Sequence, residues 1–199
     1  NMGGGFGIYY DDAHVPALAD YARALEPLLE GTGLKLVMEP GRVIVGNAGV
    51  LLTRVQFNKA SGDKRYVIVD AGMNDLIRPS LYQGVHRIWP VEGPPPPAPG
   101  QSPDEPSCDV VGPVCETGDF LGLDRPLPPV VRGDLLAVMS AGAYGYVMAS
   151  NYNERPRPPE VLVDGDRFGV VRRRETYDDL VRLDEVRPTM MAVDEGGTS

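Results

Sequence analysis

The sequence predicts two kinds of structure: the last strands of a TIM-like α/β barrel, followed by a C-terminal all-β domain of the Greek-key sandwich or barrel type. Two observations predict this fold. The first 43 residues have the order strand, glycine loop, helix, strand, which is one repeat of an α/β barrel. From residue 44 onward, short β-rich runs are separated by Gly, Pro and Asp, as is typical of all-β domains.

The barrel portion is expected to occupy residues 1–43. Residues 1–10 end a strand and enter the glycine loop, and residues 35–38 form a short buried strand that places Glu39 at its carboxyl end, where barrels carry their chemistry. Residues 15–31 predict an amphipathic helix that stops at Gly31 and Gly33. Its apolar side chains follow helical spacing: Leu18, Tyr21, Ala22, Leu25, Leu28 and Leu29.

The β domain is expected over residues 44–187, with a tail at 188–199. Strands are predicted at 43–45, 49–57, 66–70, 85–91, 108–114, 134–139, 144–150, 161–163 and 168–173. Asp164-Gly165-Asp166 predicts a hairpin between the last two strands. The Pro-rich segment 93–106 cannot join a central strand; it is interpreted as an exposed loop insertion, with a partner-binding motif as the alternative.

Composition excludes several classes of function. The chain has 19 basic and 28 acidic residues, a net charge of −9 that argues against nucleic-acid binding. No apolar run approaches the roughly 20 residues of a membrane span, and no secretory signal is present, so the cytoplasm is expected. Cys108 and Cys115 are expected to be reduced thiols, although a disulfide is possible, and no ligand spacing predicts a metal site. Because the chain opens on Asn1 inside the glycine motif, it is expected to be a piece of a longer protein.

Two segments near the start can bind an anion or an aromatic cofactor. Gly3-Gly4-Gly5, with Gly7 close by, can form a backbone N–H nest for phosphate, although a tight turn is the simpler alternative. In Glu39-Pro40-Gly41-Arg42, a carboxylate can face a pyridine nitrogen, and the guanidinium suits a carboxylate or phosphate. The alternative is a Glu–Arg pair on a surface turn.

Three later segments add groups suited to an amino-acid substrate. Arg78 and Tyr82 are four residues apart, so one helical turn would present both to a carboxylate; a surface Arg with a half-buried Tyr is the alternative. Cys115 can act as a general acid beside Glu116, which can hold an ammonium group, although a lone Cys is commonly a small core residue. Tyr144 lies among small residues that allow close backbone approach; it is otherwise an ordinary strand aromatic.

In this order, the five segments resemble the C-terminal portion of diaminopimelate decarboxylases, pyridoxal-phosphate enzymes of fold-type III, from residue 1 to about residue 185. The resemblance implies pyridoxal 5′-phosphate as cofactor, bound by Gly3, Gly4, Gly5, Glu39, Gly41, Arg42 and Tyr144. It implies that substrate is bound by Arg42, Arg78, Tyr82, Glu116 and Tyr144. Cys115 becomes the acid that protonates the carbanion, in the site of the partner subunit of a homodimer.

The resemblance further implies conversion of meso-2,6-diaminopimelate to L-lysine and carbon dioxide, the last step of lysine biosynthesis. Such an enzyme needs a lysine that forms a Schiff base with the cofactor. The chain holds only Lys35, Lys59 and Lys64, none in a setting that resembles the family's lysine, so it is expected to be inactive by itself.

Three other functions stay open. A related decarboxylase could act on D-ornithine, D-lysine, L-ornithine or L-arginine, although such substrates make little use of an Arg78/Tyr82 pair. A non-catalytic β-domain protein could bind a partner through its Pro-rich loop. An alanine-racemase-like enzyme would need a catalytic tyrosine where the sequence has Cys115.

Overall fold

The computed structural model describes residues 1–10, 15–94 and 105–190, and it divides the chain into two compact units, residues 1–155 and 156–199. Residues 95–104 of the Pro-rich segment and 191–199 of the tail lie outside the described residues. The elements are α1 (Leu18–Leu29), η1 (Gly46–Ala48), β1 (Leu51–Ser61), β2 (Lys64–Val69), α2 (Arg78–Tyr82), β3 (Ile88–Pro90), β4 (Ser107–Val111), β5 (Phe120–Pro126), β6 (Leu135–Val138), η2 (Tyr146–Met148), η3 (Tyr152–Glu154), β7 (Glu160–Asp164), β8 (Arg167–Arg172) and α3 (Tyr177–Val181).

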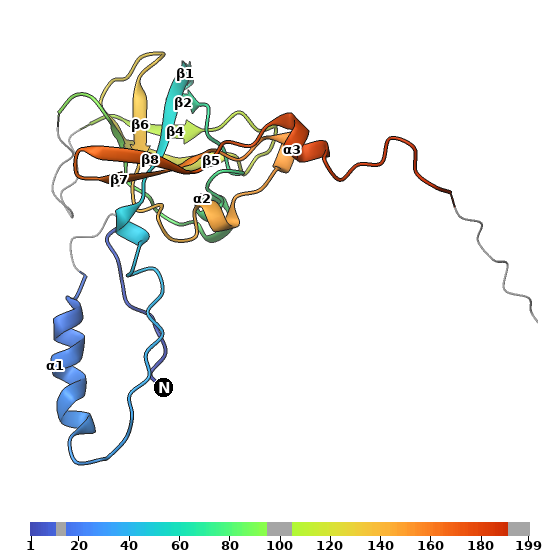
Figure 1. Cartoon of the computed structure of the whole chain (residues 1–199). Coiled ribbons are helices and arrows are strands. Elements are labelled where there is room, and N and C mark those ends of the chain that lie inside the picture. The colour runs from blue at the N-terminus through green and yellow to red at the C-terminus, as the bar shows by residue number, and fades with distance from the viewer. Residues whose placement is uncertain (11–14, 95–104, 191–199) are drawn as a thin grey trace, which may run out of the picture. The chain divides into compact units, whose positions relative to one another are not determined.

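Six strands of the first unit form one sheet with the order β3-β6-β1-β2-β4-β5 (Figure 1). β1 changes partner along its length, because residues 51–54 pair with β6 and residues 55–61 pair with β2. A two-residue turn at Gly62 and Asp63 closes the β1–β2 hairpin, and Gly62 adopts the positive φ that such turns require. β2 and β4 pair in parallel, and the crossover between them carries α2 and β3.

One apolar cluster receives side chains from all six strands, so the sheet wraps around its core in the manner of a barrel. The expected C-terminal all-β domain is confirmed in this form. The buried members from the strands are Val55, Val67, Val69, Ile88, Cys108, Val110, Leu121, Leu136 and Val138. Burial of large apolar side chains is the main favourable term in the stability of such a unit.

Two predicted strands were wrong, and one strand was missed. Residues 43–45 form a turn that leads into η1, and residues 144–150 contain η2 after Tyr144, which has a φ of 59°. β5 was not predicted. This strand is irregular, so the sequence does not show an ordinary strand pattern there. Asp124 has a φ of 50°, Pro126 ends the strand, and the pairing with β4 shifts register.

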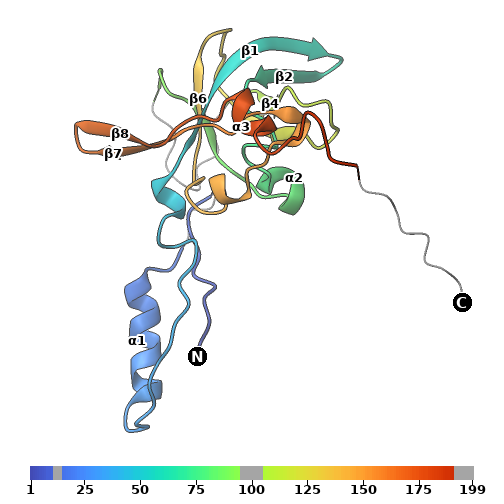
Figure 2. The same ribbon diagram turned by 45° about the vertical axis from the view of Figure 1, so that its right-hand side comes forward.

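α1 lies beside two extended segments, residues 1–9 and 34–41, as Figures 1 and 2 show. The helix prediction is confirmed, but the expected strands at 1–10 and 35–38 are not regular strands. Two backbone hydrogen bonds join the segments: Met2 N–H donates to Val37 O at 3.0 Å, and Glu39 N–H donates to Gly3 O at 2.8 Å. Parallel strands need neighbours on both sides. The described residues contain no further part of an α/β barrel.

The second unit contains the predicted hairpin and a short helix. β7 and β8 are joined at Gly165 and Asp166, and Gly165 has a φ of 61°, which confirms the hairpin prediction (Figure 2). The unpredicted helix α3 is capped by Thr176, whose backbone N–H donates to Asp179 Oδ2 at 2.8 Å. An ion pair of 2.7 Å between Arg157 and Glu175 joins the segments that flank the hairpin.

Candidate active site

The glycine loop and Glu39 lie against each other. Gly3 and Gly5 have φ values of 71° and 85°, which glycine adopts without strain. Gly4 has no room for a Cβ atom, because such an atom would clash with the carbonyl oxygen of Glu39. Asn1 fixes the arrangement: its Nδ2 donates to Glu39 Oε1 at 2.6 Å, and its Oδ1 accepts from Gly3 N–H at 2.8 Å. The first two predicted motifs therefore form one cluster.

Tyr144 reaches the same cluster from the far end of the sheet unit. A Cβ atom at Gly41 would lie 3.4 Å from the Tyr144 hydroxyl, so this side chain covers the turn between Glu39 and Arg42. Gly142 makes the approach possible, because a Cβ atom there would clash with the carbonyl oxygen of Val45. Tyr144 itself is 46% exposed, which leaves part of its ring free for a ligand.

Both predicted arginines contact one aromatic ring, that of Tyr10. The guanidinium carbon of Arg78 lies 4.7 Å from the ring centroid and that of Arg42 lies 5.7 Å from it. Arg78 is only 8% exposed. Among the described residues, neither arginine forms an ion pair with a carboxylate. A buried cation without a counter-ion is costly, which makes Arg78 a candidate for binding an anion.

A fully buried histidine, His86, contacts the guanidinium of Arg78. His86 Nε2 lies 3.1 Å from Arg78 Nη1, and His86 Nδ1 lies 2.9 Å from the carbonyl oxygen of Met139. Burial lowers the pKa of His86, and the positive charges of Arg78 and Arg125 lower it further, against the opposing hydrogen bond to Met139. The neutral ring therefore donates from Nδ1 to Met139 and accepts at Nε2 from Arg78.

Tyr10 and His86 were not among the predicted site residues. Tyr10 is placed by its neighbour Tyr9, whose carbonyl oxygen accepts hydrogen bonds from Asn47 Nδ2 at 2.6 Å and from Ser140 Oγ at 2.6 Å. A lone histidine in an apolar run and a second tyrosine after a glycine loop form no motif. Only the contact of each with an arginine marks it as part of the site.

The short helix α2 carries Arg78 and Tyr82, as the i, i+4 spacing predicts. It is anchored by Leu76, which is fully buried, and by Asp75, whose Oδ2 accepts from Gly72 N–H at 2.9 Å. Pro79 suits the first turn, where an N–H is not needed. Arg78 points into the protein, whereas Tyr82 is 61% exposed. The helix therefore places Arg78 in the protein interior and Tyr82 at the surface.

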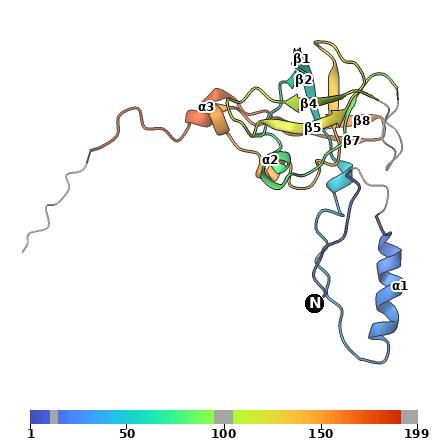
Figure 3. The same cartoon turned by 180° about the vertical axis from the view of Figure 1, so that it is seen from behind.

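The loop with Cys115 and Glu116 is tied to the segment that precedes α2. The Asp119 carboxylate accepts from Val114 N–H at 2.5 Å and from Met73 N–H at 2.6 Å. A Cβ atom at Gly118 would meet Ser80 Oγ at 2.6 Å, so the loop packs directly on α2. Figure 3 shows α2 beside β5, the strand that follows this loop. The third and fourth motifs therefore form a second cluster.

Glu116 has a partner that sequence reasoning missed. Tyr152 in η3 donates its hydroxyl to Glu116 Oε2 at 3.2 Å, and this hydrogen bond raises the pKa of Tyr152. Arg155 holds η3 near α2, because its Nη2 donates to Asp70 O at 2.6 Å and its Nε donates to Asn74 Oδ1 at 3.0 Å. No hydrogen bond or ion pair among the described residues links Glu116 or Cys115 to the glycine loop.

Residues 8–142 match the family model for the C-terminal sheet domain of pyridoxal-dependent decarboxylases. The chain belongs to this decarboxylase family. A diaminopimelate decarboxylase from Aquifex aeolicus (strain VF5) is 52% identical over 182 residues, which are 91% of this chain and 42% of the relative. A diaminopimelate decarboxylase from Pseudomonas aeruginosa is 53% identical over 191 residues, 94% of this chain and 43% of the relative. The chain thus spans less than half the length of these relatives.

Solved structures agree. A crystal structure of a protein from Aquifex aeolicus matches with a TM-score of 0.83 and 52% identity, over 92% of this chain and 44% of that one. Diaminopimelate decarboxylase from Helicobacter pylori, crystallised with L-lysine, matches with a TM-score of 0.80 and 43% identity, over 91% of this chain and 43% of that one. The resemblance predicted from the five motifs is confirmed, and with it the pyridoxal dependence of the family.

The two thiols of this decarboxylase-family chain differ in surroundings. Both are free, as expected: Cys108 is buried in the sheet core, and Cys115 is exposed. Burial raises the pKa of the Cys108 thiol to about 11, so it stays protonated and unreactive. Cys108 is therefore a packing residue of the core, and the alternative that Cys115 is a core residue is wrong.

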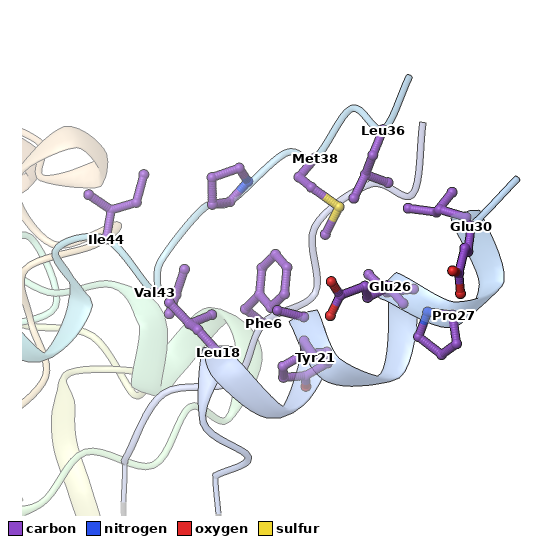
Figure 4. A pocket seen from close by; sticks show the side chains of 14 residues that line it. Phe6, Leu18, Tyr21, Glu26, Pro27, Glu30, Leu36, Met38, Val43 and Ile44 are labelled. Carbon is purple, nitrogen blue, oxygen red and sulfur yellow. The ribbon is translucent and has the colours of Figure 1, made fainter. Parts of the chain in front are cut away.

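A large apolar groove lies beside α1. It has a volume of about 1120 Å³ and is lined by α1, Phe6 and residues between 36 and 44. In Figure 4, Leu18 and Tyr21 of α1 face Phe6 and Val43, and the Phe6 and Tyr21 ring centroids are 4.9 Å apart. None of the predicted site residues lines the groove.

The described helices include none that is long and apolar enough to cross a bilayer. The described His, Cys, Asp and Glu side chains form no group of three that could hold a metal ion.

Proposed function

We propose that this chain is the C-terminal part of an enzyme that decarboxylates meso-2,6-diaminopimelate to L-lysine and carbon dioxide, the last step of lysine biosynthesis. The observation that carries the proposal is the convergence of Arg42 and Arg78 on Tyr10 without a carboxylate partner among the described residues. One carboxylate bound between two guanidiniums would supply the missing negative charge. Relatives at 52% and 53% identity bear the name of this enzyme.

The proposed substrate has an amino-acid group at each end, and the second cluster suits the end that does not react. Arg42, Arg78 and Tyr82 bind its carboxylate, and Glu116 binds its ammonium group. Tyr152 holds the Glu116 carboxylate in place through the 3.2 Å hydrogen bond. Tyr144 contacts substrate and cofactor together. The structure of the Helicobacter pylori enzyme contains L-lysine, which has the same amino-acid end.

The residues of the first cluster fit pyridoxal 5′-phosphate. Gly3 and Gly5 shape the loop through their positive φ values, and close packing on Glu39 excludes any side chain at Gly4. The Gly3 N–H donates to Asn1 Oδ1, so we assign phosphate binding to the N–H groups of the rest of the loop. Gly41, Arg42 and Tyr144 complete the binding set, and Glu39 pairs with the ring nitrogen. When bound, the cofactor supplies an electron sink for the reacting carbon. The Asn1 amide fixes the Glu39 carboxylate, so its orientation is set before binding.

Cys115 delivers the proton after carbon dioxide leaves. Its thiol is exposed on a loop that Asp119 anchors, so it can meet a group outside its own sheet unit. We propose that it enters the site of a second subunit, in a homodimer with shared active sites. Free thiols on both cysteines agree with the reducing cytoplasm, where we place the enzyme.

We also propose the boundaries of the domains in this chain. Residues 1–43 are the C-terminal piece of the cofactor-binding barrel, residues 44–187 form the β domain, and residues 188–199 are a tail. The apolar groove beside α1 would then be covered by the rest of the barrel. Of the three lysines, Lys64 forms an ion pair with Asp109 at 3.1 Å, which raises its pKa and disfavours it as the Schiff-base lysine. The chain alone is therefore expected to be inactive.

The test is turnover by the complete enzyme that contains this chain. We expect L-lysine and carbon dioxide to form from meso-diaminopimelate, with much slower reaction of D-lysine, D-ornithine, L-ornithine and L-arginine. These four lack a distal carboxylate for Arg42 and Arg78. Faster turnover of any of them than of meso-diaminopimelate would contradict the proposal and favour a related basic amino-acid decarboxylase.

A further inference from the structure

Four side chains from separate segments form one continuous contact around Arg78. The Tyr10 ring lies against the guanidiniums of Arg42 and Arg78, and it meets the His86 ring edge-on at 5.3 Å between centroids. His86 in turn contacts Arg78 Nη1 at 3.1 Å. Tyr10 precedes α1, and Arg42 follows the extended segment after α1. Arg78 is the first residue of α2, and His86 follows the end of that helix.

We propose that Tyr10 and His86 are positioning residues that hold the two arginines at one carboxylate site, and that they thereby set the preference for a substrate with a distal carboxylate. This inference rests on the proposed function and assigns roles to two residues outside its motifs.

The hydrogen-bond geometry gives His86 a defined task. An arginine has five N–H donors in a rigid fork and many rotamers. His86 takes one donor, at Nη1, and its own ring is fixed because Nδ1 donates to the Met139 carbonyl oxygen at 2.9 Å. The remaining donors of Arg78 then keep one direction. His86 has no exposed surface and so cannot act on substrate itself.

Tyr10 has a complementary task. Two guanidiniums repel each other, and the face of an aromatic ring attracts cations, so the ring lets both approach one place. This contact also couples the two regions of the chain, because Arg42 belongs to the segment beside α1 and Arg78 belongs to α2.

The inference predicts a pH dependence. The groups that face His86 are Arg78 from α2, Arg125 from β5, the Tyr10 ring and the Met139 carbonyl after β6. Protonation would remove the acceptor at Nε2 and add a cation beside two others. The pKa of His86 is lowered, so the neutral ring persists at neutral pH and is lost only as pH falls through that lowered value. Substrate binding should weaken over that acidic range.

The experiment compares variants of the complete enzyme in steady-state kinetics with meso-diaminopimelate. Loss of the buried acceptor in His86→Leu should raise KM by about 10- to 100-fold while kcat changes by less than about threefold. His86→Gln, whose amide oxygen can accept from Arg78, should recover most of the lost affinity. Val110→Ala, a matched change in the sheet core, should leave KM unchanged, because Val110 is fully buried away from the arginines.

Equal KM values for His86→Leu and Val110→Ala, or no recovery in His86→Gln, would overturn the inference. If His86→Leu fails to fold, the unmodified enzyme provides the test. Nitrogen NMR should show the proton of the neutral His86 ring on Nδ1, and KM should rise in acid as that ring becomes protonated. A proton on Nε2 would contradict the arrangement. Complete absence of turnover would refute the proposed function, whereas the His86 tautomer would still test the positioning role.

Discussion

The two regions of the first unit differ in how much of their apolar surface they bury. Residues 46–155 surround a core to which all six strands contribute, with Leu76, Leu121, Leu127 and Leu136 fully buried. Residues 1–45 contain an amphipathic helix, α1, of which no residue is buried. The sheet region buries its apolar side chains in its own core, whereas apolar side chains of α1 line an open groove.

This difference divides the candidate site. Arg78, Tyr82, Cys115 and Glu116 belong to the sheet region, where Asp75 and Asp119 fix their loops. The glycine loop and Glu39 belong to the helix region, and Arg42 follows them. The proposed substrate-binding residues therefore lie mainly on the sheet region, and most of the proposed cofactor-binding residues lie on the helix region.

The largest expected effect concerns the exposed Cys115 thiol of the sheet region. Cys115→Ala in the complete enzyme removes the proposed proton donor, so kcat should fall by about 10²- to 10⁴-fold. Steady-state turnover measures it. Cys108→Ala is the matched control, because the same atoms are removed from the core; it should lower stability and leave kcat nearly unchanged. Equal losses in the two variants would remove Cys115 from the mechanism.

Two leucine truncations in the 199-residue chain test whether the two regions differ in how they bury apolar surface. Leu121→Ala opens a cavity in the sheet core and should lower the free energy of unfolding by about 2–5 kcal/mol. Leu28→Ala on α1, where the side chain is 71% exposed, should change it by less than about 0.5 kcal/mol. Urea denaturation measures both. A large effect of Leu28→Ala would show that α1 is packed within this chain.

Arg78→Lys keeps the positive charge and removes the planar fork. KM for meso-diaminopimelate should rise by about tenfold or more with a smaller change in kcat, because a bidentate carboxylate contact is lost. Arg167→Lys in the β7–β8 turn, an exposed position, is the control and should behave like the unchanged enzyme. A loss of cofactor affinity with an unchanged KM would reassign Arg78.

The smallest effect is expected at Tyr152. Tyr152→Phe removes the hydrogen bond to Glu116, which should raise KM by about three- to tenfold. This is the effect expected from the loss of one hydrogen bond at an exposed position. Tyr177→Phe in α3, with a 73% exposed side chain, is the control. No change in KM for Tyr152→Phe would mean that Glu116 needs no support.

Much of the site could be predicted from the sequence because its motifs are local. Four adjacent residues carry Glu39 and Arg42, one helical turn carries Arg78 and Tyr82, and one loop carries Cys115 and Glu116. Tyr10, His86 and Tyr152 could not be found in this way, since each is linked to the site only through tertiary contacts. The missed strand β5 and the false strand at 144–150 have a common cause, because positive φ values at Asp124 and Tyr144 follow from tertiary packing rather than from residue type.

The most direct test of the shared carboxylate site is a double-mutant cycle of Arg42→Ala and Arg78→Ala in the complete enzyme, with kcat/KM for meso-diaminopimelate as the measurement. If both guanidiniums bind one carboxylate beside Tyr10, each single variant should lose most of the benefit, and the double variant should lose much less than the sum of the two in free energy. Strictly additive losses would show that the two arginines act at separate places and would contradict the account.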